Sequence, residues 1–161
     1  QLGFLEHPTK KMKAAAAQAL AQVGLAGKEQ INYLHLSEGQ KQLCILARTL
    51  VSDSRLLLLD EPESALDFRF RYQMLSLLHN WVSSGHRSAV VSLHDPPLAL
   101  NYCDCLLLVK DGGILDMIEP KVDSLDKMEQ ALAVIYGNIS LHRCYNRKGE
   151  AHLVMMSEEV V

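Results

Sequence analysis

Long apolar runs are missing from this sequence, and the runs that it has are short, such as the one from Cys105 to Val109. A membrane-spanning helix needs about 20 apolar residues, so we expect a chain that spans no bilayer. No charged segment leads into an apolar one, so the sequence predicts no signal peptide. The net charge of −3 is small and negative, which gives no electrostatic case for a nucleic-acid partner.

Cysteines are too few to form a disulfide scaffold. There are four in 161 residues, which is typical of a reduced, cytosolic setting. Cys103 and Cys105 form a Cys-x-Cys pair, but no second pair or nearby histidine completes a zinc-type ligand set. The composition, 48% hydrophobic and 22% charged, indicates one soluble globular domain with a core of its own.

The distribution of apolar residues predicts alternating helices and strands. Alanine-rich or three-and-four spacing predicts helices over 11–23, 38–50, 68–82 and 125–135, and Pro96-Pro97 can open a short helix. Short β-rich runs predict strands over 55–59, 87–93, 105–109 and 114–118, and a hairpin from 139–145 to 151–155. Strands that alternate with helices predict a parallel sheet.

Acidic and histidine residues follow the first two predicted strands. The run 55–59 does not alternate, which predicts a strand buried on both faces. Asp60 and Glu61 end this strand and His94 ends the next, so we expect all three at one edge of the sheet. An aspartate there can hold Mg²⁺, and a second acid can act as a general base. The alternative is a buried strand that runs into an acidic loop without function.

A serine and a glycine precede the helix predicted over 38–50. Gly39 lets the backbone approach a ligand closely, and the helix directs free N–H groups toward an anion. The alternative is an ordinary helix start, because serine at Ser37 is a favoured N-cap.

Several motifs occur together in a fixed order: LSEGQ (36–40), LLLLDEP (56–62), SALD (64–67), SLHD (92–95) and KDGGI (110–114). In this order they resemble the signature motif, Walker B motif, D-loop, switch histidine and following turn of ATPase subunits of ATP-binding cassette (ABC) transporters. The resemblance runs from about Leu20 to the C-terminus. It implies an α/β fold: a P-loop NTPase-like parallel sheet with flanking helices, lacking its N-terminal half, and a small C-terminal β hairpin.

The resemblance also implies functional roles, with ATP and Mg²⁺ as cofactors. Asp60 would hold Mg²⁺, Glu61 would polarise the attacking water, and His94 would contact the γ-phosphate. The signature residues would bind the nucleotide held by a second ATPase subunit, and the D-loop would couple the two sites of the dimer. The nucleotide-binding residues implied in this way are Ser37, Glu38, Gly39, Gln40, Ser64 and Asp67.

For the whole protein, the resemblance implies an importer subunit at the cytoplasmic face of the cell membrane. Its partners would be a second copy and integral membrane permease subunits. Residues 1–52 would be the remnant of a helical subdomain, and 53–161 the second half of the catalytic core. A late Tyr136-Gly137 and the β tail are similar to importers of iron-siderophore, haem or cobalamin. Two alternatives are a non-transport ABC ATPase and a degenerate half-cassette that acts only as an interaction module.

A phosphate-binding P-loop, G-x-x-x-x-G-K-[ST], is not present in the sequence. The nearest match is 22–29, which has Gln22 at the first glycine position and Glu29 at the Ser/Thr position, and which follows a predicted helix. We therefore expect these 161 residues to be the C-terminal part of an ABC ATPase, inactive alone.

Overall fold

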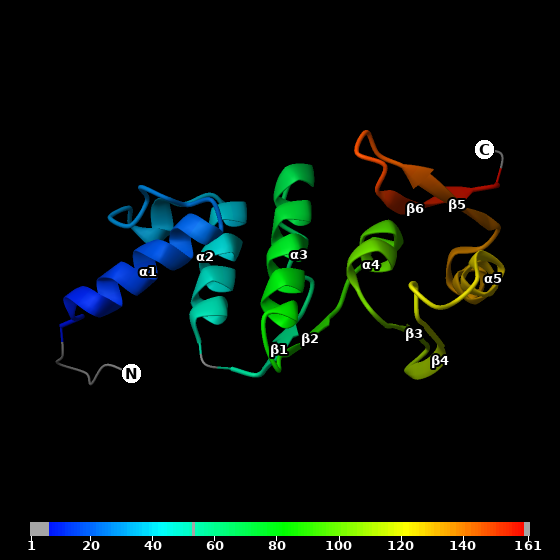
Figure 1. The fold of residues 1–161 in the computed structure, drawn as a ribbon, viewed down its shortest axis with the longest axis horizontal. Helices are drawn as coiled ribbons and strands as arrows, with labels where there is room; N and C mark the ends of the chain where they lie inside the picture. The colour runs from blue at the N-terminus through cyan, green and yellow to red at the C-terminus, as the bar shows by residue number, and fades with distance from the viewer. Residues whose placement is uncertain (1–6, 53, 160–161) are drawn as a thin grey trace. The chain divides into compact units, whose positions relative to one another are not determined.

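The chain forms two compact units, Gln1–Ser92 and Leu93–Val161. The computed structural model describes residues 7–52 and 54–159, and Figure 1 shows the order of their helices and strands. The domain division at residue 52 that the resemblance implies stays a prediction. Residues 1–6, 53 and 160–161 of the two predicted domains lie outside the described part.

The first unit contains α1 (Lys10–Gln22), a 3-10 turn η1 (Tyr33–His35), α2 (Glu38–Val51), β1 (Leu56–Leu59), α3 (Phe68–Ser83) and β2 (Ser88–Val91). Helix α1 begins at the N-cap Thr9, and the chain reverses direction after it at Gly24, which has φ of 80°. Helix α2 buries Leu43, Leu46 and Ala47, the stripe that its three-and-four spacing predicted.

The two strands of this unit are parallel, with Leu57 opposite Ala89 and Leu59 opposite Val91. This confirms a crossover through α3. The prediction that the first strand is buried on both faces was wrong: Leu57 is 4% exposed, but Leu56 and Leu58 are 54% and 73% exposed. The burial of β1 alternates along the strand, so side chains on one of its faces reach solvent.

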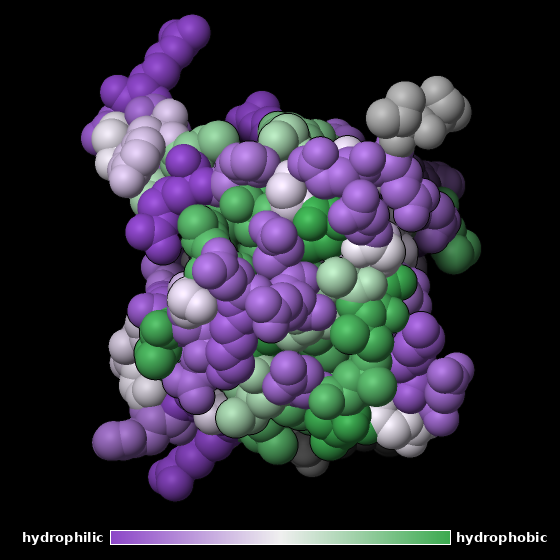
Figure 2. Space-filling view, turned by 90° about the vertical axis from the view of Figure 1, so that its right-hand side faces the viewer, coloured by the Kyte–Doolittle hydropathy of each residue, from purple (hydrophilic) through white to green (hydrophobic). Residues whose placement is uncertain are grey.

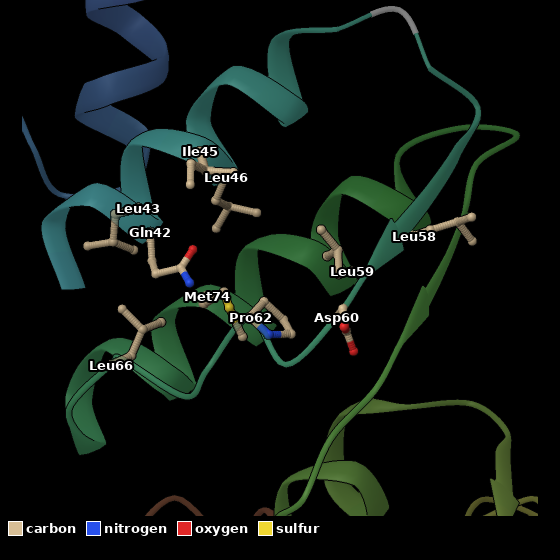
Figure 3. A pocket seen from close by; sticks show the side chains of 10 residues that line it. All are labelled: Gln42, Leu43, Ile45, Leu46, Leu58, Leu59, Asp60, Pro62, Leu66 and Met74. Carbon is tan, nitrogen blue, oxygen red and sulfur yellow. The ribbon is translucent and has the colours of Figure 1, made fainter. Parts of the chain in front are cut away.

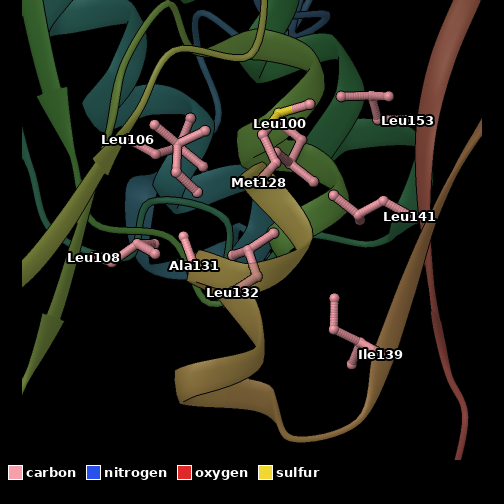
Figure 4. Close-up of a cluster of buried hydrophobic side chains, with 10 residues drawn as sticks. Leu100, Leu106, Leu108, Met128, Ala131, Leu132, Ile139, Leu141 and Leu153 are labelled. Atoms are coloured by element: carbon pink, nitrogen blue, oxygen red, sulfur yellow. The ribbon is translucent and has the colours of Figure 1, made fainter. Parts of the chain in front are cut away.

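The second unit contains α4 (Pro96–Tyr102), β3 (Leu106–Lys110), β4 (Gly113–Ile118), α5 (Leu125–Tyr136), β5 (Ile139–Tyr145) and β6 (Ala151–Ser157). Its core lies between α5 and the two hairpins, as Figure 4 shows; it is formed by Leu100, Leu106, Leu108, Ile118, Met128, Ala131, Leu132, Ile139, Leu141 and Leu153. The side chain of Asn101 ties α4 to β6, because it donates to the carbonyl of Leu153 and accepts from its N–H, both at 2.8 Å.

Strand β3 pairs antiparallel with β4, which confirms that 114–118 returns as a strand beside 105–109. The turn between them has Asp111 and Gly112 at positive φ, which is typical of a tight hairpin. Large side chains remain exposed on this hairpin, among them Leu107, Val109 and Met117. Figure 2 shows hydrophobic surface among polar side chains on the face of the molecule drawn there.

None of the described helices is both long enough and apolar enough to cross a bilayer.

Candidate functional site

Helix α2 begins with a closed capping box. The Ser37 hydroxyl accepts a hydrogen bond from the N–H of Gln40 at 3.3 Å, and the Gln40 side-chain oxygen accepts from the N–H of Ser37 at 3.2 Å. Two backbone donors are therefore satisfied within the chain, as in an ordinary helix start. The first helical N–H groups, those of Glu38 and Gly39, have no acceptor within a helix and point out of its N-terminus. They are the donors that an anion would meet there.

Gly39 packs against the loop that follows β1. A Cβ atom at Gly39 would lie 3.1 Å from the carbonyl oxygen of Ala65 and 3.6 Å from a methyl of Leu66. The glycine therefore allows a close approach, as the sequence analysis expected, but the partner seen is this chain's own backbone. The contact brings the LSEGQ and SALD segments side by side in the first unit.

Glu38, the acidic residue of the LSEGQ segment, directs its carboxylate along α2. Its Oε1 lies 2.6 Å from the ammonium of Lys41, and its side chain is 77% exposed. An acid in the first turn of a helix is also favoured by the helix dipole. The carboxylate thus lies beside the helix.

Asp60 and Glu61 lie where the two parallel strands end. The ladder continues one residue past β2, because the N–H of Ser92 donates to the carbonyl of Leu59 at 2.9 Å. The Ser92 hydroxyl then donates to Asp60 Oδ1 at 2.7 Å and accepts from the N–H of Glu61 at 2.8 Å. A parallel register therefore brings Ser92 to the acidic edge of the sheet, and a hydroxyl joins the two acids there.

The chain turns sharply after β1. Glu61 has φ of 42°, in the left-handed region that non-glycine residues rarely occupy. Its carbonyl accepts from the N–H of Ser64 at 3.2 Å, which closes the turn. Asp67 then serves as the N-cap of α3, since its carboxylate accepts from the N–H of Phe70 at 3.1 Å. The two predicted D-loop residues are thus placed by a tight turn and a helix cap.

His94 belongs to the second unit, where it is exposed in the segment between β2 and α4. Asp95 follows it and caps α4 by accepting from the N–H of Leu98 at 3.0 Å. The other predicted site residues lie in the first unit, which brings the LSEGQ, DE and SALD segments together. In the chain, only Leu93 separates His94 from Ser92.

A pocket of about 200 Å³ lies between α2, β1 and the loop leading to α3 (Figure 3). Its lining is mostly apolar and consists of Gln42, Leu43, Ile45, Leu46, Leu58, Leu59, Asp60, Pro62, Leu66 and Met74. Phosphates need N–H donors or cations, and this lining provides few of either. We therefore do not assign the pocket to the nucleotide.

Asp60 is suited to hold Mg²⁺ in the way that nucleotide sites do. No group of three or more His, Cys, Asp or Glu residues able to hold a metal occurs in the described part of the chain. Mg²⁺ bound with nucleotides keeps several waters and takes only one or two carboxylates besides the phosphates. A single exposed carboxylate at a strand end is enough for that role, and a complete set of protein ligands is not required.

Ser92 is the site residue that the sequence analysis missed. The second strand was predicted to run over 87–93, which placed Ser92 inside it, whereas β2 ends at Val91. A strand boundary two residues earlier would have placed this hydroxyl beside Asp60 and Glu61 at the sheet edge.

Comparisons with known proteins agree with the motifs. The ABC transporter family model matches residues 2–64. An aliphatic sulfonates import ATP-binding protein of Paraburkholderia xenovorans is 38% identical over 85% of this chain and 56% of its own length. A cobalamin import ATP-binding protein of Halobacterium salinarum is 35% identical over 67% of this chain and 27% of its own length. The chain spans about half the length, or less, of the curated relatives it matches.

Solved structures show the same fold. An ABC transporter described as of metal-chelate type, in an inward-facing conformation, aligns with a TM-score of 0.77 and 24% identity over 98% of this chain and 62% of its own. An ATP-binding cassette solved as a dimer with ADP and Pi aligns with a TM-score of 0.65 and 23% identity over 73% of this chain and 51% of its own. By its motifs, its relatives and its fold, the chain is similar to the ATP-binding cassettes of ABC transporters.

Proposed function

We propose that the chain forms the signature-to-C-terminus part of the ATP-hydrolysing subunit of an ABC importer. The observation that carries this proposal is the edge where β1 and β2 end. Asp60 and Glu61 lie there together, and the following loop contacts Gly39 at the start of α2. A carboxylate pair and a helix N-terminus in one unit are the parts that nucleotide hydrolysis needs from this half of a cassette.

In this proposal Asp60 holds Mg²⁺, which neutralises charge on the phosphates when it is bound. Glu61 orients a water and takes its proton. Its side chain is exposed at the turn, which leaves room for that water. His94 contacts the γ-phosphate and holds that water in line. Ser92 ties the strand that leads to His94 to both acids.

The start of α2 faces the nucleotide of a second subunit, a homodimer partner. Ser37 and Gln40 keep the helix terminus rigid through their capping box, while the N–H groups of Glu38 and Gly39 meet the γ-phosphate. Ser64 and Asp67 lie beside Gly39 along the chain's SALD loop and couple the two sites. The dimeric cassette with ADP and Pi supports this arrangement by its fold.

For the transported substrate we propose a metal chelate of the iron-siderophore, haem or cobalamin type. Support comes from the metal-chelate type transporter, which aligns over 98% of this chain, and from the cobalamin relative. Relatives named for sulfonates, thiamine and phosphonates are similarly identical, from 36% to 42%, so identity alone does not select the substrate. Permease subunits at the cytoplasmic face of the membrane complete the proposed assembly.

The test requires the P-loop that this sequence lacks. We define the completed cassette as a chimaera in which the upstream segment of the Paraburkholderia xenovorans sulfonate relative precedes all 161 residues. The expected result is Mg²⁺-dependent ATP hydrolysis. Glu61→Gln should lower the rate by roughly 10²-fold or more, the share of a general base, and leave ATP binding intact. Glu119→Gln, at an exposed glutamate in the second unit, is the matched control and should retain the parent rate.

Two results would contradict the proposal. A completed cassette that is folded by circular dichroism and binds ATP, yet does not hydrolyse it, would favour the interaction-module alternative. A Glu61→Gln variant with the parent rate would remove Glu61 from the role of base.

A further inference from the structure

The Ser92 hydroxyl joins two residues that lie 32 and 31 positions earlier in the chain, Asp60 and Glu61. A carboxylate only accepts hydrogen bonds and a backbone N–H only donates them. The single hydroxyl proton of Ser92 must therefore go to Asp60, while its oxygen accepts from Glu61. Both ends of the bridge have one possible direction, so the hydroxyl orients two groups at once.

The bridge acts on a backbone that is held away from its preferred conformation. At φ of 42°, Glu61 persists in the left-handed region only because its surroundings determine it. Ser92 holds its N–H, and the N–H of Ser64 holds its carbonyl. The direction in which the Glu61 side chain leaves the turn is thus set by hydrogen bonds on both sides of its Cα.

On the carboxylate, the bridge orients the group. Asp60 Oδ1 accepts from Ser92 at 2.7 Å, and an ionised carboxylate keeps further acceptor sites for a cation. Ser92 is itself fixed, because its N–H continues the β1–β2 ladder to the carbonyl of Leu59 at 2.9 Å. The backbone that carries the hydroxyl is therefore held by the β1–β2 ladder.

We propose that Ser92 is a positioning residue for ATP hydrolysis: it aligns the metal-binding carboxylate of Asp60 and the backbone of the base Glu61 from one sheet-mounted hydroxyl. This inference rests on the proposed function. It adds that the end of β2 is tied to both acids by one side chain.

The first experiment uses the 161-residue chain and does not depend on activity. Hydrogen exchange of the Glu61 amide is measured by NMR in Ser92→Ala, Ser92→Thr and the control Ser88→Ala, which removes an exposed serine at the other end of β2. Exchange should be roughly three- to tenfold faster in Ser92→Ala, the factor that one ordinary hydrogen bond represents. It should be close to the parent in Ser92→Thr, which keeps the hydroxyl, and in Ser88→Ala. Fluorescence of Trp81, the one tryptophan of the sequence, verifies that the first unit is folded.

The second experiment uses the completed cassette. Ser92→Ala should lower kcat by about tenfold, within the range of lost positioning effects, with KM for ATP within about twofold of the parent. The Mg²⁺ concentration for half-maximal rate should rise several-fold, and Ser92→Thr should restore both values. A loss of fold alone would lower the active fraction without moving the Mg²⁺ midpoint.

Unchanged exchange of the Glu61 amide in Ser92→Ala would overturn the inference, as would an unchanged kcat and Mg²⁺ midpoint. If Ser92→Ala does not fold, Ser92→Cys replaces it, because it keeps the size but donates weakly; parent-like exchange and kcat in that variant would overturn the inference equally. An inactive parent cassette would count against the proposed function, whereas the exchange experiment would still decide the role of the bridge.

Discussion

Replacing Gly39 by alanine tests the contact between the LSEGQ and SALD segments. The added Cβ would lie 3.1 Å from the carbonyl oxygen of Ala65 and 3.6 Å from a methyl of Leu66. The first distance is well inside the roughly 3.5–4.0 Å at which non-bonded atoms pack best. Either α2 or the loop must shift, because the nearest obstacle is a backbone oxygen rather than the end of a flexible side chain.

Two opposing effects set the magnitude. Alanine is favoured over glycine in a helix by about 0.5–1 kcal/mol, whereas overpacking costs about 1–3 kcal/mol. We therefore expect Gly39→Ala to lower the free energy of unfolding of the first unit by about 0.5–2 kcal/mol. The matched control is Gly85→Ala, because a Cβ there meets nothing within 4 Å. Because no atom opposes the added Cβ, Gly85→Ala should leave the stability of the first unit unchanged or raise its free energy of unfolding by up to about 1 kcal/mol.

Trp81 makes the measurement specific to the first unit. It is the one tryptophan of the sequence, lies in α3 and is 7% exposed, so its fluorescence reports unfolding of this unit. Urea denaturation of the two variants and the parent, followed at this side chain, gives the difference directly. If Gly39→Ala proves as stable as Gly85→Ala, then the close approach to Ala65 does not constrain the start of α2, and our account of this glycine is refuted.

Three further predictions follow from the site and the second unit. The 161-residue chain alone should show no micromolar ATP binding in calorimetry, because one helix terminus contributes about 0.3–2 kcal/mol against the roughly 8 kcal/mol of a micromolar complex; a micromolar titration would contradict this. In the completed cassette, Glu38→Gly should leave ATPase activity within a few-fold, since its carboxylate is turned to Lys41, whereas Ser37→Arg should abolish activity by filling the phosphate site; a large gain for Glu38→Gly that grows at low salt would show that the acid faces the phosphate. The hydrogen bond from Lys127 lowers the pKa of Asp123 below its ordinary value. The pair therefore stabilises the second unit fully at pH values above the pKa of Asp123 in the unfolded chain. This stabilisation is lost as the pH falls through the lower pKa of Asp123 in the folded chain. Acid denaturation followed by circular dichroism should show less dependence on pH in Asp123→Asn, and an identical acid limb would count against the pair.

The helices and strands could be predicted from the sequence because their signals are local. Thr9, Ser37 and Ser124 cap their own helices within three residues, and apolar spacing marks the buried stripe of α2. The Asp111-Gly112 turn likewise needs only its own φ preferences. Each of these interactions joins residues close in the chain, so a pattern in the sequence is enough to find it.

The burial of the strands could not be predicted as completely. The sequence indicated that β1 and β2 are parallel, but not that Leu56 and Leu58 would be exposed. An apolar run indicates which side chains of a strand can be buried. It does not indicate which face of that strand another element covers.

The sequence alone therefore determined the order of elements, the positions of Asp60 and Glu61 after a strand, and the helix start at Ser37. The tertiary structure decided which distant groups meet there. The Ser92 bridge depends on strand register across more than 30 residues, and the contact of Gly39 with Ala65 depends on how α2 packs against a loop. Such contacts are set by packing between segments far apart in the chain, and neither residue carries a local pattern that reveals its partner.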